Sequence, residues 1–130
     1  MISSIRVDGT TACMTIDGAT DTAVFRAYVQ QVLSPTLRAG DVVILDNLSP
    51  HKSDGTLELI KKQGAEVHFL PANSPDLNPI EMMWSKIKTS LRSAEARTEA
   101  ALTAAIAAAL ASVTAQDARN WFAHCGYSFI

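Results

Sequence analysis

Several features that mark common protein classes are scarce or missing in this sequence. Its 130 residues contain two cysteines, Cys13 and Cys125, which lie near opposite ends, with no Cys-x-x-Cys motif and no Cys/His cluster at zinc spacing. We therefore expect free thiols and neither a disulfide framework nor a zinc site. No run approaches the roughly 18 apolar residues of a membrane span, and the N-terminus lacks the apolar core of a signal peptide. These absences predict a cytoplasmic protein with no membrane partner.

The sequence also lacks a surplus of positive charge. It has 11 Lys and Arg against 13 Asp and Glu, a formal net charge of -2, whereas a protein that clamps DNA unaided carries excess Lys and Arg to displace counterions. Any contact with nucleic acid must therefore be local or assisted. No glycine-rich phosphate loop follows any predicted strand, which disfavours the alternative of a doubly wound α/β module that binds a nucleotide.

What the sequence does contain favours one mixed α/β domain over residues 1–130, since the length suits a single core and 48% of the residues are hydrophobic. Residues 3–7 and 12–16 are predicted strands of a hairpin that turns at Asp8-Gly9. A helix is predicted from Asp21, capped there or at Thr20 and ended by Ser34-Pro35. Its apolar stripe consists of Val24, Phe25, Tyr28, Val29, Val32 and Leu33.

The middle of the chain predicts a strand, helix, strand unit. Consecutive branched residues at 42–45 indicate a strand buried on both faces, as in a parallel sheet covered by helices. A short helix over 56–63, closed by Gly64, leads to a second strand over 66–70. Asp46 follows the first of these strands, so we expect it at the carboxyl end, the edge where α/β sheets place their sites.

The last third is predicted to be helical. Asn78 is placed to cap a helix with Pro79 at its first position, and this helix runs to about Arg92. Residues 94–115 are rich in alanine and predict one long helix that packs closely against another. Thr114 and Asp117 resemble a capping box that starts a short final helix, ending near Gly126.

Asp46 and Glu81 are the candidate catalytic and metal-binding pair. Each has a structural alternative, because Glu81 can close a capping box with the Asn78 amide and an Asp after a strand often caps a turn. Two carboxylates that converge repel each other unless a cation lies between them, and Mg²⁺ or Mn²⁺ suits such oxygen ligands. A pair of these ions promotes phosphodiester transfer.

Three residues of the loop after Asp46, namely Asn47, His51 and Lys52, are secondary candidates that would overhang the same site. Lys86, Lys88 and Arg92 follow Glu81 and are candidate phosphate contacts, although solvated helix faces account for most such charges. His68, within a predicted strand, has a structural interpretation. Trp84 and Trp121 are expected in the core rather than as stacking platforms.

These residues carry a family resemblance. The segment Val42-Val43-Ile44-Leu45-Asp46-Asn47 with His51, and the segment 74–81, Ser-Pro-Asp-Leu-Asn-Pro-Ile-Glu, with Trp84 and Lys88, resemble the catalytic half of bacterial insertion-sequence transposases related to mariner, in the DDE superfamily. The resemblance implies an RNase H-like α/β fold, a mixed sheet flanked by helices, and three acidic residues that bind two Mg²⁺ ions to cut and rejoin DNA at transposon ends. It makes Asp46 the second acid and Glu81 the third.

The first acid of that family lies on a central strand upstream of the hairpin, after a DNA-binding helix-turn-helix. Neither is found here, and neither Asp8 in the turn nor Asp17 after it replaces that acid. We therefore expect an N-terminally truncated catalytic domain with a helical part from about residue 94, inactive alone, from a remnant or a split element. An upstream polypeptide or a second copy would complete the sheet. The alternative is a non-catalytic remnant that associates with full-length transposase through the alanine-rich helix and modulates it.

Overall fold

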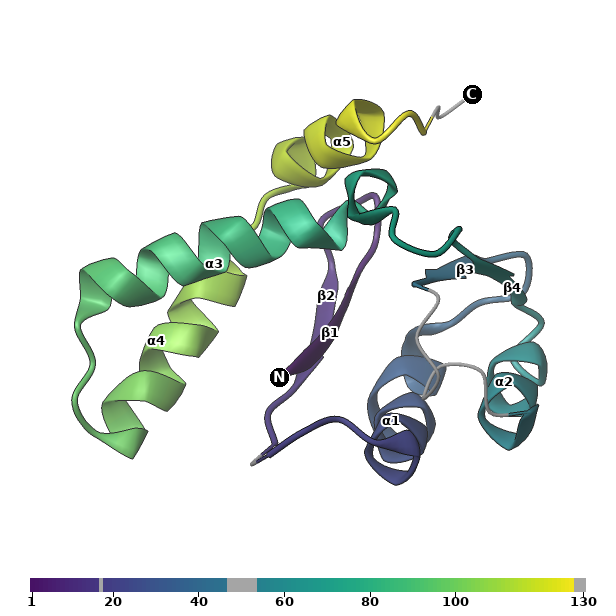
Figure 1. Ribbon diagram of the computed structural model, residues 1–130, viewed down its shortest axis with the longest axis horizontal. Coiled ribbons are helices and arrows are strands. Elements are labelled where there is room, and N and C mark those ends of the chain that lie inside the picture. The colour runs from purple at the N-terminus through teal and green to yellow at the C-terminus, as the bar shows by residue number, and fades with distance from the viewer. Residues whose placement is uncertain (17, 47–53, 128–130) are drawn as a thin grey trace. The chain divides into compact units, whose positions relative to one another are not determined.

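A computed structural model describes residues 1–16, 18–46 and 54–127 of the chain (Figure 1). The chain divides into two compact units. Unit 1 comprises Met1–Ser4 and Ala12–Pro75, and unit 2 comprises Ile5–Thr11 and Asp76–Ile130. Unit 1 contains both strands and helices, and unit 2 is mostly helical. The single domain expected from the sequence stays a prediction.

The predicted N-terminal hairpin is confirmed. Strands β1 (Ile2–Ile5) and β2 (Thr11–Met14) form a two-stranded sheet, and each begins one residue earlier than the sequence pattern suggested. Gly9 in the turn has φ of +90°, a conformation that glycine adopts without a steric penalty. Asp8 accepts a 2.8 Å hydrogen bond from the Thr10 amide, so Asp8 serves the turn.

In unit 1 the predicted amphipathic helix is also confirmed. Helix α1 (Thr22–Tyr28) is capped by Asp21, whose side chain accepts from the Val24 amide at 2.8 Å. It continues as a π-helical turn, η1 (Val29–Leu33), and a 3₁₀ turn, η2 (Ser34–Thr36). Four large apolar residues on its inner face are buried: Phe25, Tyr28, Val29 and Leu33.

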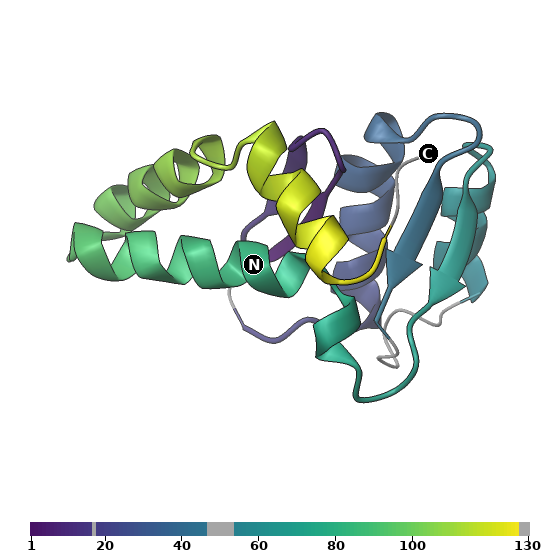
Figure 2. The ribbon, with the colours of Figure 1, turned by 90° about the horizontal axis from the view of Figure 1, so that it is seen from above.

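The strand, helix, strand unit consists of β3 (Val42–Leu45), α2 (Asp54–Lys61) and β4 (Glu66–Phe69). The two strands pair in parallel with Val43 opposite Val67, as expected. Figures 1 and 2 show α1 and α2 on the same face of this sheet. The core between them includes Ile60 and Ala65 together with the buried face of α1 and η1.

One expectation about β3 is wrong within unit 1: the strand is not buried on both faces. Val43 and Leu45 pack against the core cluster, but Val42 keeps 53% of its surface exposed. Its partners on that second face, Glu66 and His68, lie outside this core as well. A run of branched residues therefore shows only that a strand forms, because the second face is covered or bare according to what packs on it. Among the described residues, no third strand pairs with β3 or β4.

Unit 2 is built on three helices, α3 (Ile80–Ala94), α4 (Glu99–Ala111) and α5 (Ala115–His124). Helices α3 and α4 lie side by side, and α5 packs on α3 (Figure 1). Met83, Ile87 and Ala109 are the buried centre of the contact. Trp84 and Trp121 pack against this cluster as expected, but both are only half-buried, so the stacking alternative stays open for Trp84.

The alanine-rich helix expected over residues 94–115 forms with narrower bounds, as α4 (Glu99–Ala111). Glu95 ends α3 in the left-handed region with φ of 49°, and Thr98 caps α4 by accepting from the Ala101 amide at 3.0 Å. The break between α3 and α4 therefore lies a few residues later than the sequence suggested, because high helix propensity on both sides obscures where one helix ends. The capping box of α5, formed by Thr114 and Asp117, is confirmed.

Both cysteines are free, as expected. Within the described residues, no single helix is long and apolar enough to cross a membrane. Only together, as a pair bent by 74°, do α4 and α5 reach the required length and composition.

Candidate functional site

Asp46 follows β3 directly and is half-buried. Because β3 and β4 are parallel, both strands end at the same edge of the sheet, where the Leu70 amide donates to the Leu45 carbonyl at 2.8 Å. This is the carboxyl edge at which open α/β sheets place their ligands. The structure therefore puts Asp46 at the edge that the sequence predicted.

The secondary candidates Asn47, His51 and Lys52 fall in the segment 47–53, which lies outside the described residues. Their roles stay predictions. His68 lies on β4 with its side chain exposed, and its Nε2 atom is 3.3 Å from a Glu66 carboxylate oxygen.

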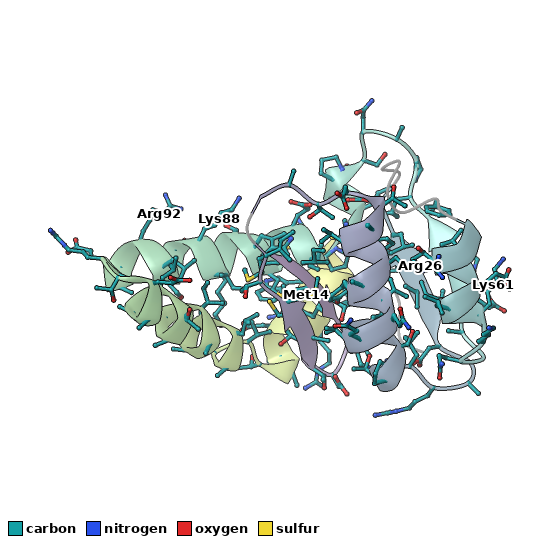
Figure 3. The ribbon with its side chains drawn as sticks, turned by 90° about the horizontal axis from the view of Figure 1, so that it is seen from below. Met14, Arg26, Lys61, Lys88 and Arg92 are labelled. Carbon is teal, nitrogen blue, oxygen red and sulfur yellow. The ribbon has the colours of Figure 1, made fainter. Side chains whose placement is uncertain are left out.

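Arg26 is a basic residue on the Asp46 side that sequence reasoning missed. A Cβ atom built on Gly55, in the first turn of α2, would lie 3.1 Å from the Arg26 Nη1 atom, so the glycine leaves room for the guanidinium group. In a strand, helix, strand unit the helix begins near the edge where the first strand ends. Arg26 is exposed on α1 and extends toward α2 (Figure 3). The glycine early in a helix was the available signal.

Glu81 belongs to unit 2 and lies in the first turn of α3. The helix starts here because Pro79 fixes its own φ angle and Asn78 accepts, through Oδ1, from the Ile80 amide at 3.3 Å. The Glu81 side chain is exposed, and no described residue makes a hydrogen bond or ion pair with its carboxylate. The capping-box alternative for Glu81 thus finds no support, and the carboxylate is available to a ligand.

A stripe of polar residues runs along α3 from Glu81. Ser85, Lys88 and Arg92 follow at intervals of four, three and four residues, which places all four on one side of a 3.6-residue helix. The stripe spans about 16 Å at 1.5 Å per residue. Figure 3 shows Lys88 and Arg92 projecting from the same side of α3, away from α4. We call these four residues the α3 stripe.

Lys86 lies on a different side of α3 and is already engaged. Its Nζ atom donates to Asp117 Oδ2 at 2.5 Å and to the Ser112 carbonyl at 2.9 Å. The hydrogen bond from Lys86 and those from the Thr114 backbone and side chain hold the pKa of Asp117 below its usual value. Lys86 therefore fixes α5 against α3. Because its charge is already paired, Lys86 is a weaker candidate for a phosphate contact than Lys88 or Arg92.

A shallow groove of about 520 Å³ lies between α3 and α5 beside the stripe. The hydroxyl side chains of Ser85, Thr89 and Ser90 line it, together with Met82, Lys86, Asp117 and Trp121. Its lining is mostly uncharged or internally paired, so the groove adds polar contacts to the stripe without adding free charge.

Asp46 and Glu81 belong to different units, so the structure describes the surroundings of each carboxylate separately. In the described part of the chain, no three His, Cys, Asp or Glu residues gather into a metal-binding group. The metal role of the pair therefore stays a prediction that rests on ligand chemistry and position.

Comparison with known proteins gives a match to a family and a similar relative. Residues 1–103 match the family described as DDE superfamily endonuclease, a range that contains both carboxylates and the whole α3 stripe. The chain is also 28% identical over 85 residues to the "Transposable element Tcb2 transposase" of Caenorhabditis briggsae. That match covers 62% of this chain and 31% of the relative, so the chain spans about a third of the relative's length.

Proposed function

Because this chain belongs to the DDE superfamily of endonucleases, we propose that it forms part of the catalytic domain of a DNA transposase related to mariner. In the intact protein this domain cuts and joins DNA strands at transposon ends. The observation that carries the proposal is the family match over residues 1–103, which includes Asp46 at the carboxyl edge of β3 and Glu81 in the first turn of α3. The similar protein from Caenorhabditis briggsae is itself a transposase.

DDE superfamily endonucleases generally use divalent metals, and the donor chemistry of this chain fits Mg²⁺ or Mn²⁺. Carboxylate oxygens are the hard ligands that these ions prefer. Glu81 is exposed in the first turn of α3, where its carboxylate is accessible to a ligand. When bound, such ions activate water and stabilise the leaving oxygen in phosphodiester transfer. Asp46 and Glu81 would hold them.

The basic residues of the site would hold the DNA backbone. Lys88 and Arg92 continue the stripe that starts at Glu81, and Arg26 lies on the Asp46 side. Phosphate contacts position a nucleic acid without reading its sequence. With a net charge of -2, these local groups supply the attraction that the chain as a whole lacks.

The fold proposed for the intact domain is RNase H-like, with a further strand beside β3. Among the described residues β3 pairs only with β4, and Val42 on the second face is 53% exposed. An unpaired strand edge favours the addition of a strand. We assign that strand, and the first catalytic acid, to an upstream polypeptide or a second copy of the chain.

Titration of the chain with Mn²⁺ tests the metal ligands. Asp46→Asn and Glu81→Gln should each weaken binding more than about tenfold, since each removes a charged ligand. Glu58→Gln in unit 1 and Glu99→Gln in unit 2 are matched controls, because both acids are exposed on other helices. Equal affinity in all five proteins would remove the metal site from the proposal.

A nicking assay with transposon-end DNA and Mn²⁺ tests the incomplete site. We expect little or no cleavage by this chain alone, and cleavage once a polypeptide carrying the upstream strand and acid is added. A peptide that carries that strand alone should bind the chain and raise the melting temperature of the chain. Efficient cutting by the purified chain would contradict the assignment of the first acid to another segment.

The alternative function is that of a non-catalytic partner of full-length transposase. The observation in its favour is the exposed apolar surface of α4. No residue of α4 after Glu99 is charged, but Leu102 is 44% exposed and most alanines of the helix are exposed. Helices that are apolar all round are usually covered. Copurification with intact transposase that is abolished in Leu102→Gln, with no metal-dependent cleavage, would favour this function.

A further inference from the structure

The C-terminal segment of the chain lies beyond the family match, which ends at residue 103. It nevertheless makes two specific contacts with the part of unit 2 that presents Glu81. One contact is at the turn before α3, and the other is within α3. Together they concern how the chain positions its proposed metal ligand.

The first contact joins Tyr127 to the turn before α3. The Tyr127 hydroxyl donates to the Leu77 carbonyl at 2.9 Å. The Tyr127 ring packs edge-on against Phe122, with centroids 5.7 Å apart and an interplanar angle of 67°. The Tyr127 amide also donates to the Phe122 carbonyl at 3.0 Å. The hydroxyl is therefore held by α5 and aimed at a carbonyl four residues before Glu81.

Leu77 ends a 3₁₀ turn, η4 (Pro75–Leu77), that leads into the helix start. Pro75 and Pro79 have no amide hydrogen, so the segment 75–79 has few backbone donors of its own. The first amides of α3 bond only locally, Glu81 to the Asn78 carbonyl at 3.1 Å and Met82 to the Pro79 carbonyl at 3.1 Å. The hydrogen bond from Tyr127 is thus a long-range contact that holds the segment where α3 begins.

The second contact is the bond of Lys86 to Asp117 and to the Ser112 carbonyl. It fixes the start of α5 five residues after Glu81 along α3. Asp117 cannot move freely, because it also closes the capping box of α5. Helix α5 is consequently anchored at its start by Lys86, and the segment that follows it is anchored by Tyr127.

From these contacts we propose that Tyr127 is a positioning residue for Glu81, acting through Leu77 and the start of α3. The segment from α5 to Tyr127 is then a support of the catalytic unit rather than an appended tail. This inference rests on the proposed function where it names Glu81 as a metal ligand. The mechanical support of the helix start stands on the geometry of unit 2 alone.

The test compares Tyr127→Phe with Tyr28→Phe in the full chain. The two tyrosines are matched, since Tyr28 also donates to a backbone carbonyl, that of Ala12 at 2.8 Å, but within unit 1. Each variant loses one hydroxyl and keeps its ring. Hydrogen exchange at the amides of residues 80–83 and the affinity for Mn²⁺ are measured on both and on the wild type.

In Tyr127→Phe we expect exchange at these four amides to accelerate roughly 2- to 10-fold, the effect of removing one hydrogen bond. Mn²⁺ affinity should fall, while hydrogen exchange at the amides of α1 in unit 1 stays unchanged. In Tyr28→Phe neither exchange at residues 80–83 nor metal affinity should change. Wild-type exchange in Tyr127→Phe, or an equal effect in both variants, would overturn the support of α3.

The metal measurement separates the inference from the proposed function. If the wild type binds Mn²⁺ and Tyr127→Phe accelerates exchange without weakening that binding, Tyr127 supports the helix but does not position a ligand. If the wild type binds no Mn²⁺ while exchange still responds, the support of α3 holds and the assignment of Glu81 as a ligand fails.

Discussion

Gly9, in the turn of the N-terminal hairpin, lies directly against the backbone of Thr114, the cap of α5. A Cβ atom built on Gly9 would be 2.9 Å from both the carbonyl carbon and the carbonyl oxygen of Thr114. Real Cβ atoms do not approach backbone this closely, so the contact admits only glycine. It joins the two ends of unit 2, which are more than 100 residues apart in the chain.

Gly9→Ala should therefore destabilise unit 2 by more than the ordinary cost of alanine at positive φ. That cost is roughly 1 kcal/mol, and overpacking adds about 1–3 kcal/mol. Gly126→Ala is the matched control, since Gly126 has φ of +91° in the same unit with nothing within 4 Å of its Cβ position. Urea denaturation measures both, and equal decreases in stability would show that the hairpin does not contact α5.

Glu95→Gly should stabilise the chain by up to about 1 kcal/mol, because relief of the left-handed penalty of roughly 1–2 kcal/mol exceeds the entropy that glycine adds to the unfolded chain. Glu95 occupies the left-handed region at φ of 49°, where glycine is the preferred residue at the end of a helix. Asn73→Gly provides the comparison, because Asn73 has φ of 57° and asparagine tolerates this region better than glutamate. The increase in urea midpoint should be smaller for Asn73→Gly, and a decrease in Glu95→Gly would contradict the prediction.

The Lys86–Asp117 pair predicts an acid dependence of stability. The folded-state pKa of Asp117 is lowered, chiefly by the hydrogen bond from Lys86. Stability from this ionisation is therefore fully present above the unfolded pKa, about 3.9, and is lost as the pH falls through the lower folded value. Lys86→Met should raise the pKa of Asp117 and flatten this dependence, as measured by carboxyl NMR titration and by urea denaturation from about pH 2 to 6.

Lys61→Met is the control for that experiment. Lys61 lies 3.8 Å from Glu58, and both side chains are more than half exposed, so this pair should contribute little. If Lys61→Met reduced the pH dependence of stability as much as Lys86→Met, the Lys86–Asp117 pair would not be the main source of that dependence.

Lys88→Gln and Arg92→Gln should each reduce the salt dependence of binding to transposon-end DNA. Removing one phosphate-binding cation lowers the slope of log K against log salt by about 0.9. The reduction should be similar for any DNA sequence, because these side chains would contact phosphates and not bases. Lys62→Gln, an exposed lysine that follows α2, should leave the slope unchanged. Slopes that do not differ among the three variants would remove the α3 stripe from the DNA interface.

The sequence alone predicted the hairpin turn at Asp8-Gly9, a cap of α1 at Thr20 or Asp21, the parallel pairing of β3 with β4 and the capping box at Thr114. Each of these depends on residues within a short stretch of chain, where turn conformation, capping and hydrophobic period act directly. It placed the break between α3 and α4 a few residues too early, because strong helix propensity on both sides of Glu95 obscures where one helix ends.

Only the tertiary structure decided what those elements meet. In it Val42 is exposed, Lys86 pairs with Asp117, 31 residues away in the sequence, and Tyr127 bonds to Leu77, 50 residues away. Local pattern states which face of a helix is apolar, but not which distant residue packs on it. That choice depends on the free energy of burying both surfaces together, which no short segment contains.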